Sequence, residues 1–146
     1  MAIYFYSTSD KYGILSNFSP HGVEMAGQWW PTVEHYFQGQ KFGNAEYVEK
    51  IRTATNPKQA KSLGRSRKFP IRTDWEEVKD EIMYQACLKK FQTHKEVKEL
   101  LLSTGDEELI ENAPSDYYWG CGKTGTGQNK LGQILMRVRA ELRQAE

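Results

Sequence analysis

The sequence predicts an α+β fold, in which residues 1–146 form one compact, helix-dominated domain with a few short strands. Three observations lead to this prediction. The 146 residues are enough for one domain with a hydrophobic core of its own. Apolar residues recur at helical spacing over most of the chain, and several of these runs lie between a helix-capping residue and a glycine. No repeat, low-complexity tract or linker divides the sequence, so we expect a single domain.

Three places in the sequence have the pattern of short strands. Residues 3–6 form an aromatic and β-branched run that ends at a polar turn. Residues 23–25 and 28–30 flank Ala26-Gly27, a pair typical of a tight hairpin. Residues 109–111 are the remaining candidate strand.

The helix that follows the hairpin has a clear start signal. Thr32 is a favourable N-cap residue, and Glu34 lies in the first turn, where the positive end of the helix dipole favours a carboxylate. This helix is expected to end near Gly43.

Five further helices are predicted from similar signals. Asn56-Pro57 combines an N-cap residue with proline at the first helical position, and Thr73 with Glu76 has the spacing of a capping box. The expected helices cover residues 45–53, 56–64, 73–93, 97–105 and 129–142.

The composition excludes several classes of protein. Twenty Lys and Arg against 19 Asp and Glu give a net charge of +1, which argues against strong non-specific nucleic-acid binding. Cys87, Cys121 and the three histidines lack metal-ligand spacing, so we expect no metal and no cofactor. The two cysteines are expected to be free thiols, and neither a signal peptide nor a membrane span is visible, so we expect a cytoplasmic protein with no membrane partner.

One helix face groups three polar side chains that can act on one substrate. At about 100° per residue, Gln38 lies roughly 40° from Glu34 and Lys41 roughly 20° from it on the other side. The alternative is a solvated stripe with a single charge pair. An aromatic-rich helix with a glycine is a poor choice for a purely exposed element, and this favours a functional stripe.

Two other segments are candidate parts of a binding site. Asp116 precedes Trp119, Gly120 and Gly122, and glycines allow the backbone to approach a ligand while an indole covers one face. The alternative is an ordinary turn with a core tryptophan, but residues 119–127 hold four glycines and must form a longer loop.

A basic segment follows the predicted helix end at Gly64. Arg65, Arg67 and Lys68 are suited to hold a phosphate, since the guanidinium group binds phosphate oxygens in pairs. A solubilising basic loop is the alternative. His35 is expected to be a hydrogen-bonded helix histidine and not a catalyst.

Together these residues resemble the YbiA/NADAR family, whose name refers to NAD and ADP-ribose. The similar stretches extend in order over nearly the whole chain, and the motifs are specific in combination. They are residues 5–7, 15–18, 30–38, 41–42, 60 with 63–65, 75 with 83, 90–91, 101–105, 116 with 119–122, and 129–139. The third position of the tryptophan–glycine motif, Cys121 here, varies in the family.

The resemblance implies cleavage of an N-glycosidic bond at ribose C1. One implied substrate class is the phosphorylated ribosylamino-pyrimidine intermediates of riboflavin biosynthesis, and the near-neutral charge favours such a small metabolite. A second is ADP-ribosylated guanine in DNA, from which related proteins remove ADP-ribose. A module that binds ADP-ribose or NAD without catalysis is the alternative from another functional class. Such a module needs no Glu–Lys pair on one stripe, so the pair favours the hydrolase.

Breaking the C1–N bond builds positive charge on the ribose, and this assigns a role to each candidate residue. Glu34 is the expected carboxylate near C1, and Asp116 the second carboxylate, which binds ribose hydroxyls or assists the leaving base. Lys41 either keeps Glu34 ionised or attacks C1 as an amine of depressed pKa. The expected substrate-binding residues are Asn17, Phe18, Gln38, Arg65, Arg67, Trp119, Gly120, Gly122 and Asn129.

Overall fold

The computed structural model describes residues 1–146, and they form six α-helices, one 3₁₀ turn and four short strands. The helices are α1 (Val33–Gly39), α2 (Ala45–Arg52), α3 (Pro57–Arg65), α4 (Trp75–Thr93), α5 (Lys95–Ser103) and α6 (Lys130–Gln144), with the 3₁₀ turn η1 at Gly13–Leu15. The strands are β1 (Ala2–Phe5), β2 (Val23–Met25), β3 (Gln28–Trp30) and β4 (Glu108–Glu111). The predicted α+β, helix-dominated fold is therefore confirmed.

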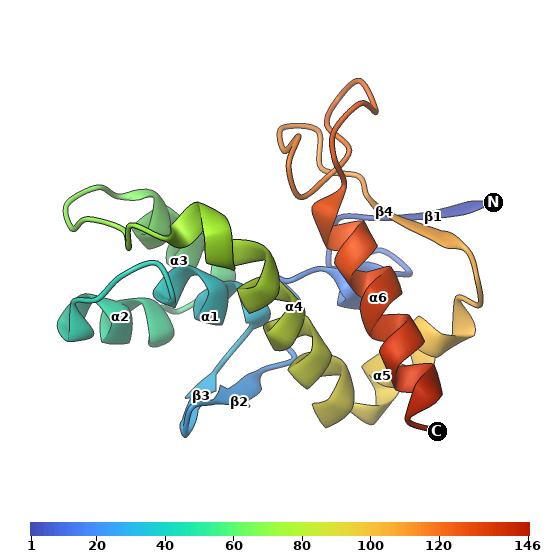
Figure 1. The fold of residues 1–146 in the computed structure, drawn as a ribbon, viewed down its shortest axis with the longest axis horizontal. Helices are drawn as coiled ribbons and strands as arrows, with labels where there is room; N and C mark the ends of the chain where they lie inside the picture. The colour runs from blue at the N-terminus through green and yellow to red at the C-terminus, as the bar shows by residue number, and fades with distance from the viewer.

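The long helix α4 lies between two groups of elements (Figure 1). On one side α1, α2 and α3 pack together, and α1 contacts α4. On the other side α6 packs against both α4 and β4, which is paired with β1. The main core joins both sides, since one cluster of buried side chains extends from Val33 and Phe37 of α1 through Met83 of α4 to Leu135 of α6.

The strands form two separate pairs instead of one sheet. β2 and β3 are the predicted antiparallel hairpin, with Ala26 and Gly27 at positive φ in its turn. β1 and β4 are parallel, with Ala2 opposite Glu108 and Phe5 opposite Glu111. Their pairing is decided by the tertiary fold, because 102 residues separate the end of β1 from the start of β4.

The N-cap prediction for α1 is confirmed. The Thr32 side chain accepts a hydrogen bond from the backbone N–H of His35 at 3.1 Å. The His35 ring is also hydrogen bonded, through Nδ1 to Thr32 at 2.8 Å and through Nε2 to the carbonyl of Ala54 at 3.0 Å. His35 is thus the buried, fully bonded helix histidine that the sequence indicated.

Two details of the predicted helices are wrong. Helix α1 ends at Gly39 and not near Gly43, because Phe42 turns away to bridge with Ile71. The capping box at the start of α4 does not form: Asp74 is the N-cap residue and makes no side-chain bond to the helix. Its carboxylate instead binds the guanidinium of Arg72, with Nε–Oδ1 at 2.6 Å.

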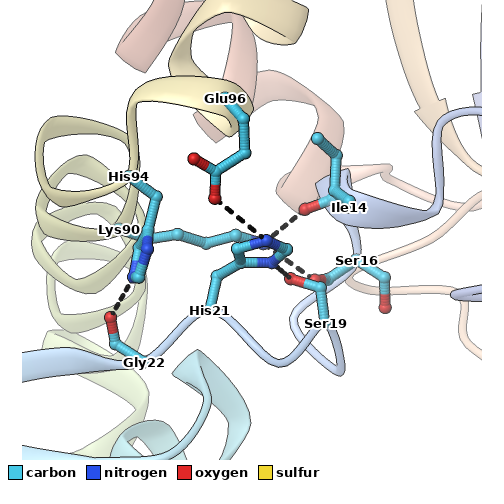
Figure 2. A network of polar contacts seen from close by, with 8 residues as sticks. All are labelled: Ile14, Ser16, Ser19, His21, Gly22, Lys90, His94 and Glu96. Carbon is cyan, nitrogen blue, oxygen red and sulfur yellow. Dashed lines mark hydrogen bonds and ion pairs between the residues drawn. The ribbon is translucent and has the colours of Figure 1, made fainter.

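A buried lysine of α4 fixes the segment that leads from η1 towards the hairpin (Figure 2). Lys90 is 1% exposed and donates to the carbonyls of Ile14 at 2.5 Å and Ser16 at 2.9 Å. Nearby, His94 donates through Nε2 to the carbonyl of Gly22 at 2.7 Å. Because Asn17 follows Ser16 directly, Lys90 holds the backbone that carries Asn17.

Candidate active site

A cavity of about 820 Å³ lies where the two halves of the fold meet. Its walls come from α1, α3, the first half of α4, the segment after η1, and the loop that follows β4. Seven of the predicted catalytic and binding residues line it together with Arg65: Asn17, Phe18, Glu34, Gln38, Lys41, Asp116 and Trp119. Residues about 100 positions apart in the chain therefore face one space.

Glu34 and Gln38 form the buried part of the α1 wall. Glu34 is 7% exposed and Gln38 is 4% exposed, so the alternative of a solvated stripe is wrong. Gln38 Nε2 donates to Glu34 Oε2 at 2.6 Å. Burial raises the pKa of Glu34, and the Gln38 hydrogen bond and the charges of Lys61 and Lys41 oppose this only in part.

Lys41 lies in the turn after α1 instead of on the helix itself. Its Nζ is 3.4 Å from the carbonyl of Gly64 and 5.9 Å from the centre of the Trp75 ring. Burial lowers the pKa of Lys41 to about 8, although the charge of Glu34 acts in the opposite direction. An appreciable fraction of this amine is thus neutral near pH 8.

Asp116 and Trp119 form the opposite wall. The Oδ1 atom of Asp116 accepts hydrogen bonds from the backbone N–H groups of Tyr118 at 3.0 Å and Trp119 at 2.8 Å. The Trp119 ring is half-buried and stands edge-to-face against Phe37 of α1, with ring centres 5.3 Å apart. These contacts fix both the carboxylate and the indole relative to α1.

Asn17 and Phe18 line the wall that Lys90 anchors. The Asn17 amide is buried against α4, where Nδ2 is 3.3 Å from Met83 Sδ and Oδ1 is 3.7 Å from Cys87 Sγ. The backbone carbonyl of Asn17 also accepts the N–H of Glu34 at 3.2 Å, so this wall is tied directly to α1.

Basic side chains of α3 form another wall of the cavity. Lys58, Lys61 and Arg65 lie at helical spacing on one face of α3 and all line the cavity. Arg67 does not line it: its Nη1 donates to the carbonyls of Gly64 at 3.0 Å and Ser66 at 3.1 Å. The contiguous basic segment after Gly64 indicated Arg65 but not the two lysines, which join it only through helical spacing.

Three predicted binding residues lie behind the cavity wall. Asn129 does not line the cavity, since its amide donates to the Leu109 carbonyl at 2.9 Å and accepts the Glu111 N–H at 3.0 Å. Gly120 and Gly122 also do not line it. A Cβ at Gly120 would lie 2.9 Å from the Glu111 carbonyl, and Gly122 adopts φ 71°, so both glycines serve the shape of the loop.

The structure adds a carboxyl group that the sequence analysis missed. Glu111 is the last residue of β4, and it lines the cavity together with Glu34 and Asp116. Its Oε1 is buried without a hydrogen-bond partner. Burial, with smaller contributions from the charges of Asp116 and Glu34, raises the pKa of Glu111 to about 7. The available signal was an acidic residue at the end of the short strand expected at residues 109–111.

No group of three or more His, Cys, Asp and Glu side chains is arranged to hold a metal ion. Both cysteines are free and buried, and no helix is long and apolar enough to cross a membrane. The charged groups that line the cavity are carboxyls, amines and a guanidinium.

The model of the NADAR domain family matches residues 4–143 of the chain. The chain belongs to the NADAR domain family. The match includes every residue described at the cavity, and it confirms the resemblance seen in the sequence. This NADAR domain has the same fold as the Escherichia coli protein YbiA in its NMR structure, with a TM-score of 0.91 and 45% identity over 99% of this chain and 86% of that chain.

Curated relatives of this NADAR domain carry two kinds of name. "N-glycosidase Npun_R5314" of Nostoc punctiforme is 49% identical over 98% of this chain and 94% of its own length. "N-glycosidase YbiA" of E. coli K12 is 46% identical over 96% of this chain and 88% of its own length. "Riboflavin biosynthesis protein PYRR, chloroplastic" of Zea mays is 42% identical over 96% of this chain, but over only 25% of its own length.

Proposed function

We propose that this NADAR domain is an N-glycosidase, which hydrolyses the bond between C1 of a phosphorylated ribose and the nitrogen of a base. The observation that carries this proposal is one cavity with carboxyl groups on two walls and the basic side chains of α3 on a third. A ribosyl phosphate has the matching pattern, because its C1 becomes positive during cleavage while its phosphate stays negative. The names of the relatives from Nostoc and E. coli support the same reaction.

Glu34 is the proposed carboxylate at C1. It stabilises positive charge on the ribose or activates the attacking water, and a raised pKa makes a carboxylate a stronger base. A Glu34→Gln variant keeps the shape of the side chain but removes the charge. Cleavage at the rate of the parent would exclude a chemical role for Glu34, whereas ligand binding without cleavage by the parent would support a non-catalytic ADP-ribose or NAD module.

Of the two roles open to Lys41, we favour attack on C1. A lysine whose pKa is about 8 still carries a charge in most molecules at pH 7, but its neutral fraction is far larger than that of an ordinary lysine, which makes it an available nucleophile. In this route the amine bonds to C1, the base leaves, and opening of the ribose ring gives an imine that water then hydrolyses. Borohydride added during turnover would trap the sugar on Lys41, and an unlabelled protein with active turnover would refute the covalent route.

The remaining residues have binding roles in this proposal. Trp119 stacks on the base, Asp116 accepts hydrogen bonds from ribose hydroxyls, and Arg65 binds the phosphate together with the two lysines of α3. Asn17, Phe18 and Gln38 also line the cavity.

The proposed substrate is a phosphorylated ribosylamino-pyrimidine, as in riboflavin biosynthesis. The name of the maize relative supports this class, and so does a net charge of +1, which does not favour a DNA polyanion. ADP-ribosylated guanine in DNA is the second candidate. It is supported by the size of the cavity, about 820 Å³, which is in the upper part of the usual range of roughly 300–1,000 Å³.

A parallel assay separates the candidates. The purified protein is incubated with a ribosylamino-pyrimidine phosphate and, separately, with DNA that carries ADP-ribosylated guanine, and release of the base is measured. We expect faster release from the pyrimidine. Faster release of guanine would make ADP-ribosylated DNA the substrate instead, and no release from either would refute the glycosidase proposal.

A further inference from the structure

The backbone of Glu111 is held from both sides. Its N–H donates to Asn129 Oδ1 at 3.0 Å, and its carbonyl accepts the N–H of Cys121 at 2.9 Å. Asn129 is itself fixed by its second bond, to the carbonyl of Leu109. Gly120 leaves no room for a side chain beside the Glu111 carbonyl. The loop after β4 therefore clamps the strand end that delivers Glu111 to the cavity.

The side chain of Glu111 lacks the contacts that a buried carboxylate needs. Oε1 is buried with no hydrogen-bond donor, and Glu111 has no ion pair, although Lys61 lines the same cavity. Two other carboxyl groups, of Asp116 and Glu34, raise its pKa further through their charges. A negative charge in such a place is costly, whereas a neutral carboxylic acid is much less so.

We propose that Glu111 is the acid that protonates the leaving base, and that Asn129 is the residue that positions it. This inference rests on the proposed glycosidase activity. The electron pair of the C1–N bond moves to the nitrogen, which takes the carboxyl proton of Glu111, so the base leaves neutral. The nucleophile that bonds to C1 releases one proton to Glu34. Water then returns that proton from Glu34 to Glu111, and the protein ends in its starting state.

The environments of the three carboxyl groups assign the donor to Glu111. Glu34 accepts a hydrogen bond from Gln38 and has Lys61 and Lys41 nearby, contacts that favour its ionised form, whereas Oε1 of Glu111 has no hydrogen-bond donor. Asp116 accepts two backbone N–H groups through Oδ1, which suits an acceptor of ribose hydroxyls. A donor and an acceptor in one site are obtained when neighbouring carboxyl groups have different environments.

A Glu111→Gln variant tests the proposal with two leaving groups. An acid catalyst typically contributes about 10²–10⁴-fold. We expect kcat for release of the base to fall by at least about 10²-fold, while release of 4-nitrophenolate from a 4-nitrophenyl riboside 5-phosphate changes by less than about threefold, because this leaving group needs no proton. Glu34→Gln should slow both reactions. Equal losses with both leaving groups in Glu111→Gln would overturn the proposal.

Glu108→Gln is the matched control, since Glu108 is exposed on the same strand and should leave both rates unchanged. Asn129→Ala should reproduce the selective loss in weaker form, whereas equal losses with both leaving groups would refute its positioning role.

A direct titration makes the inference independent of the choice of substrate. Side-chain carboxyl signals are followed by ¹³C NMR over pH, and the signal missing from Glu111→Gln identifies Glu111. We expect its midpoint near pH 7. A midpoint in the usual range of glutamate, about 4–5, would overturn the proposal even if the parent is active. An inactive parent with a midpoint near 7 would instead refute the proposed substrates and leave the protonated acid established.

Discussion

Gly64 controls the hydrogen bond that orients Glu34, although it belongs to α3 and Glu34 to α1. A Cβ added at Gly64 would lie 1.9 Å from Gln38 Oε1 and 2.6 Å from Gln38 Cδ. Both atoms belong to the amide whose Nε2 donates to Glu34 at 2.6 Å. In a Gly64→Ala variant the amide must therefore rotate away, and the bond to Glu34 is lost.

The expected loss falls on catalysis more than on stability. A hydrogen bond to a charged group contributes about 1.5–3 kcal/mol, which corresponds to roughly 10–150-fold in kcat/KM if the transition state depends on it. Alanine gains about 1 kcal/mol of helix propensity over glycine, and this offsets part of the strain of repacking. We expect kcat/KM to fall about 10–100-fold, with a change in the free energy of unfolding of less than about 1.5 kcal/mol.

The pH profile gives a second measurement. The Gln38 hydrogen bond lowers the pKa of Glu34, so its loss should move the acidic limb of kcat/KM to higher pH. A double-mutant cycle with Gln38→Ala is the control, since adding Gly64→Ala to that variant should cost little once the amide is gone. An unchanged kcat/KM in Gly64→Ala, or full additivity in the cycle, would refute this reasoning.

Three other predictions concern stability and binding. Lys90→Met should destabilise the fold by about 2–5 kcal/mol, since two buried carbonyls lose their donor. Because burial lowers the pKa of Lys90 to about 7, the free energy of unfolding of the parent should rise as pH rises from 7 to 10.5. Chemical denaturation of Lys90→Met over the same pH range should show no such rise. The parent should lose stability as pH rises from 4.5 to 7, since in this range only the folded state keeps the proton on Glu111. Glu111→Gln should not show this loss, and an equal loss in the variant would contradict the raised pKa of Glu111. Arg65→Ala should raise KM for a phosphorylated substrate at least about tenfold and leave kcat for a substrate without phosphate unchanged, whereas equal effects on both substrates would exclude a phosphate role.

The local sequence determined most of the secondary structure. Thr32 and Asn56 cap their helices as predicted, because an N-cap bond joins residues only three positions apart. The hairpin also formed as predicted, because its turn at Ala26-Gly27 joins two strands that are adjacent in the sequence. Local reasoning was wrong where another partner competes, whether near or distant in the chain. Asp74 binds Arg72, two residues away, instead of capping α4, and Phe42 bridges to the distant Ile71 and ends α1 early.

In the candidate site, too, some features follow from the local sequence and others from tertiary packing. Periodicity placed Glu34 and Gln38 on one face, and helical spacing is a property of the chain itself. Whether that face is exposed or buried was decided by α3, which packs so closely that Gly64 touches Gln38. No local pattern distinguishes a solvated stripe from a catalytic wall, since both have the same polar residues.

The sequence by itself thus determined a helix-dominated domain with Glu34, Lys41 and Asp116 as the residues of interest. Only the tertiary structure decided that Glu111 joins them and that Asn129 stands behind the wall. The physical reason is the parallel pairing of β1 with β4, which sets where Glu111 points, together with burial, which changes the proton affinity of a carboxyl group. Both depend on segments about 100 residues apart in the chain, and a local pattern contains neither.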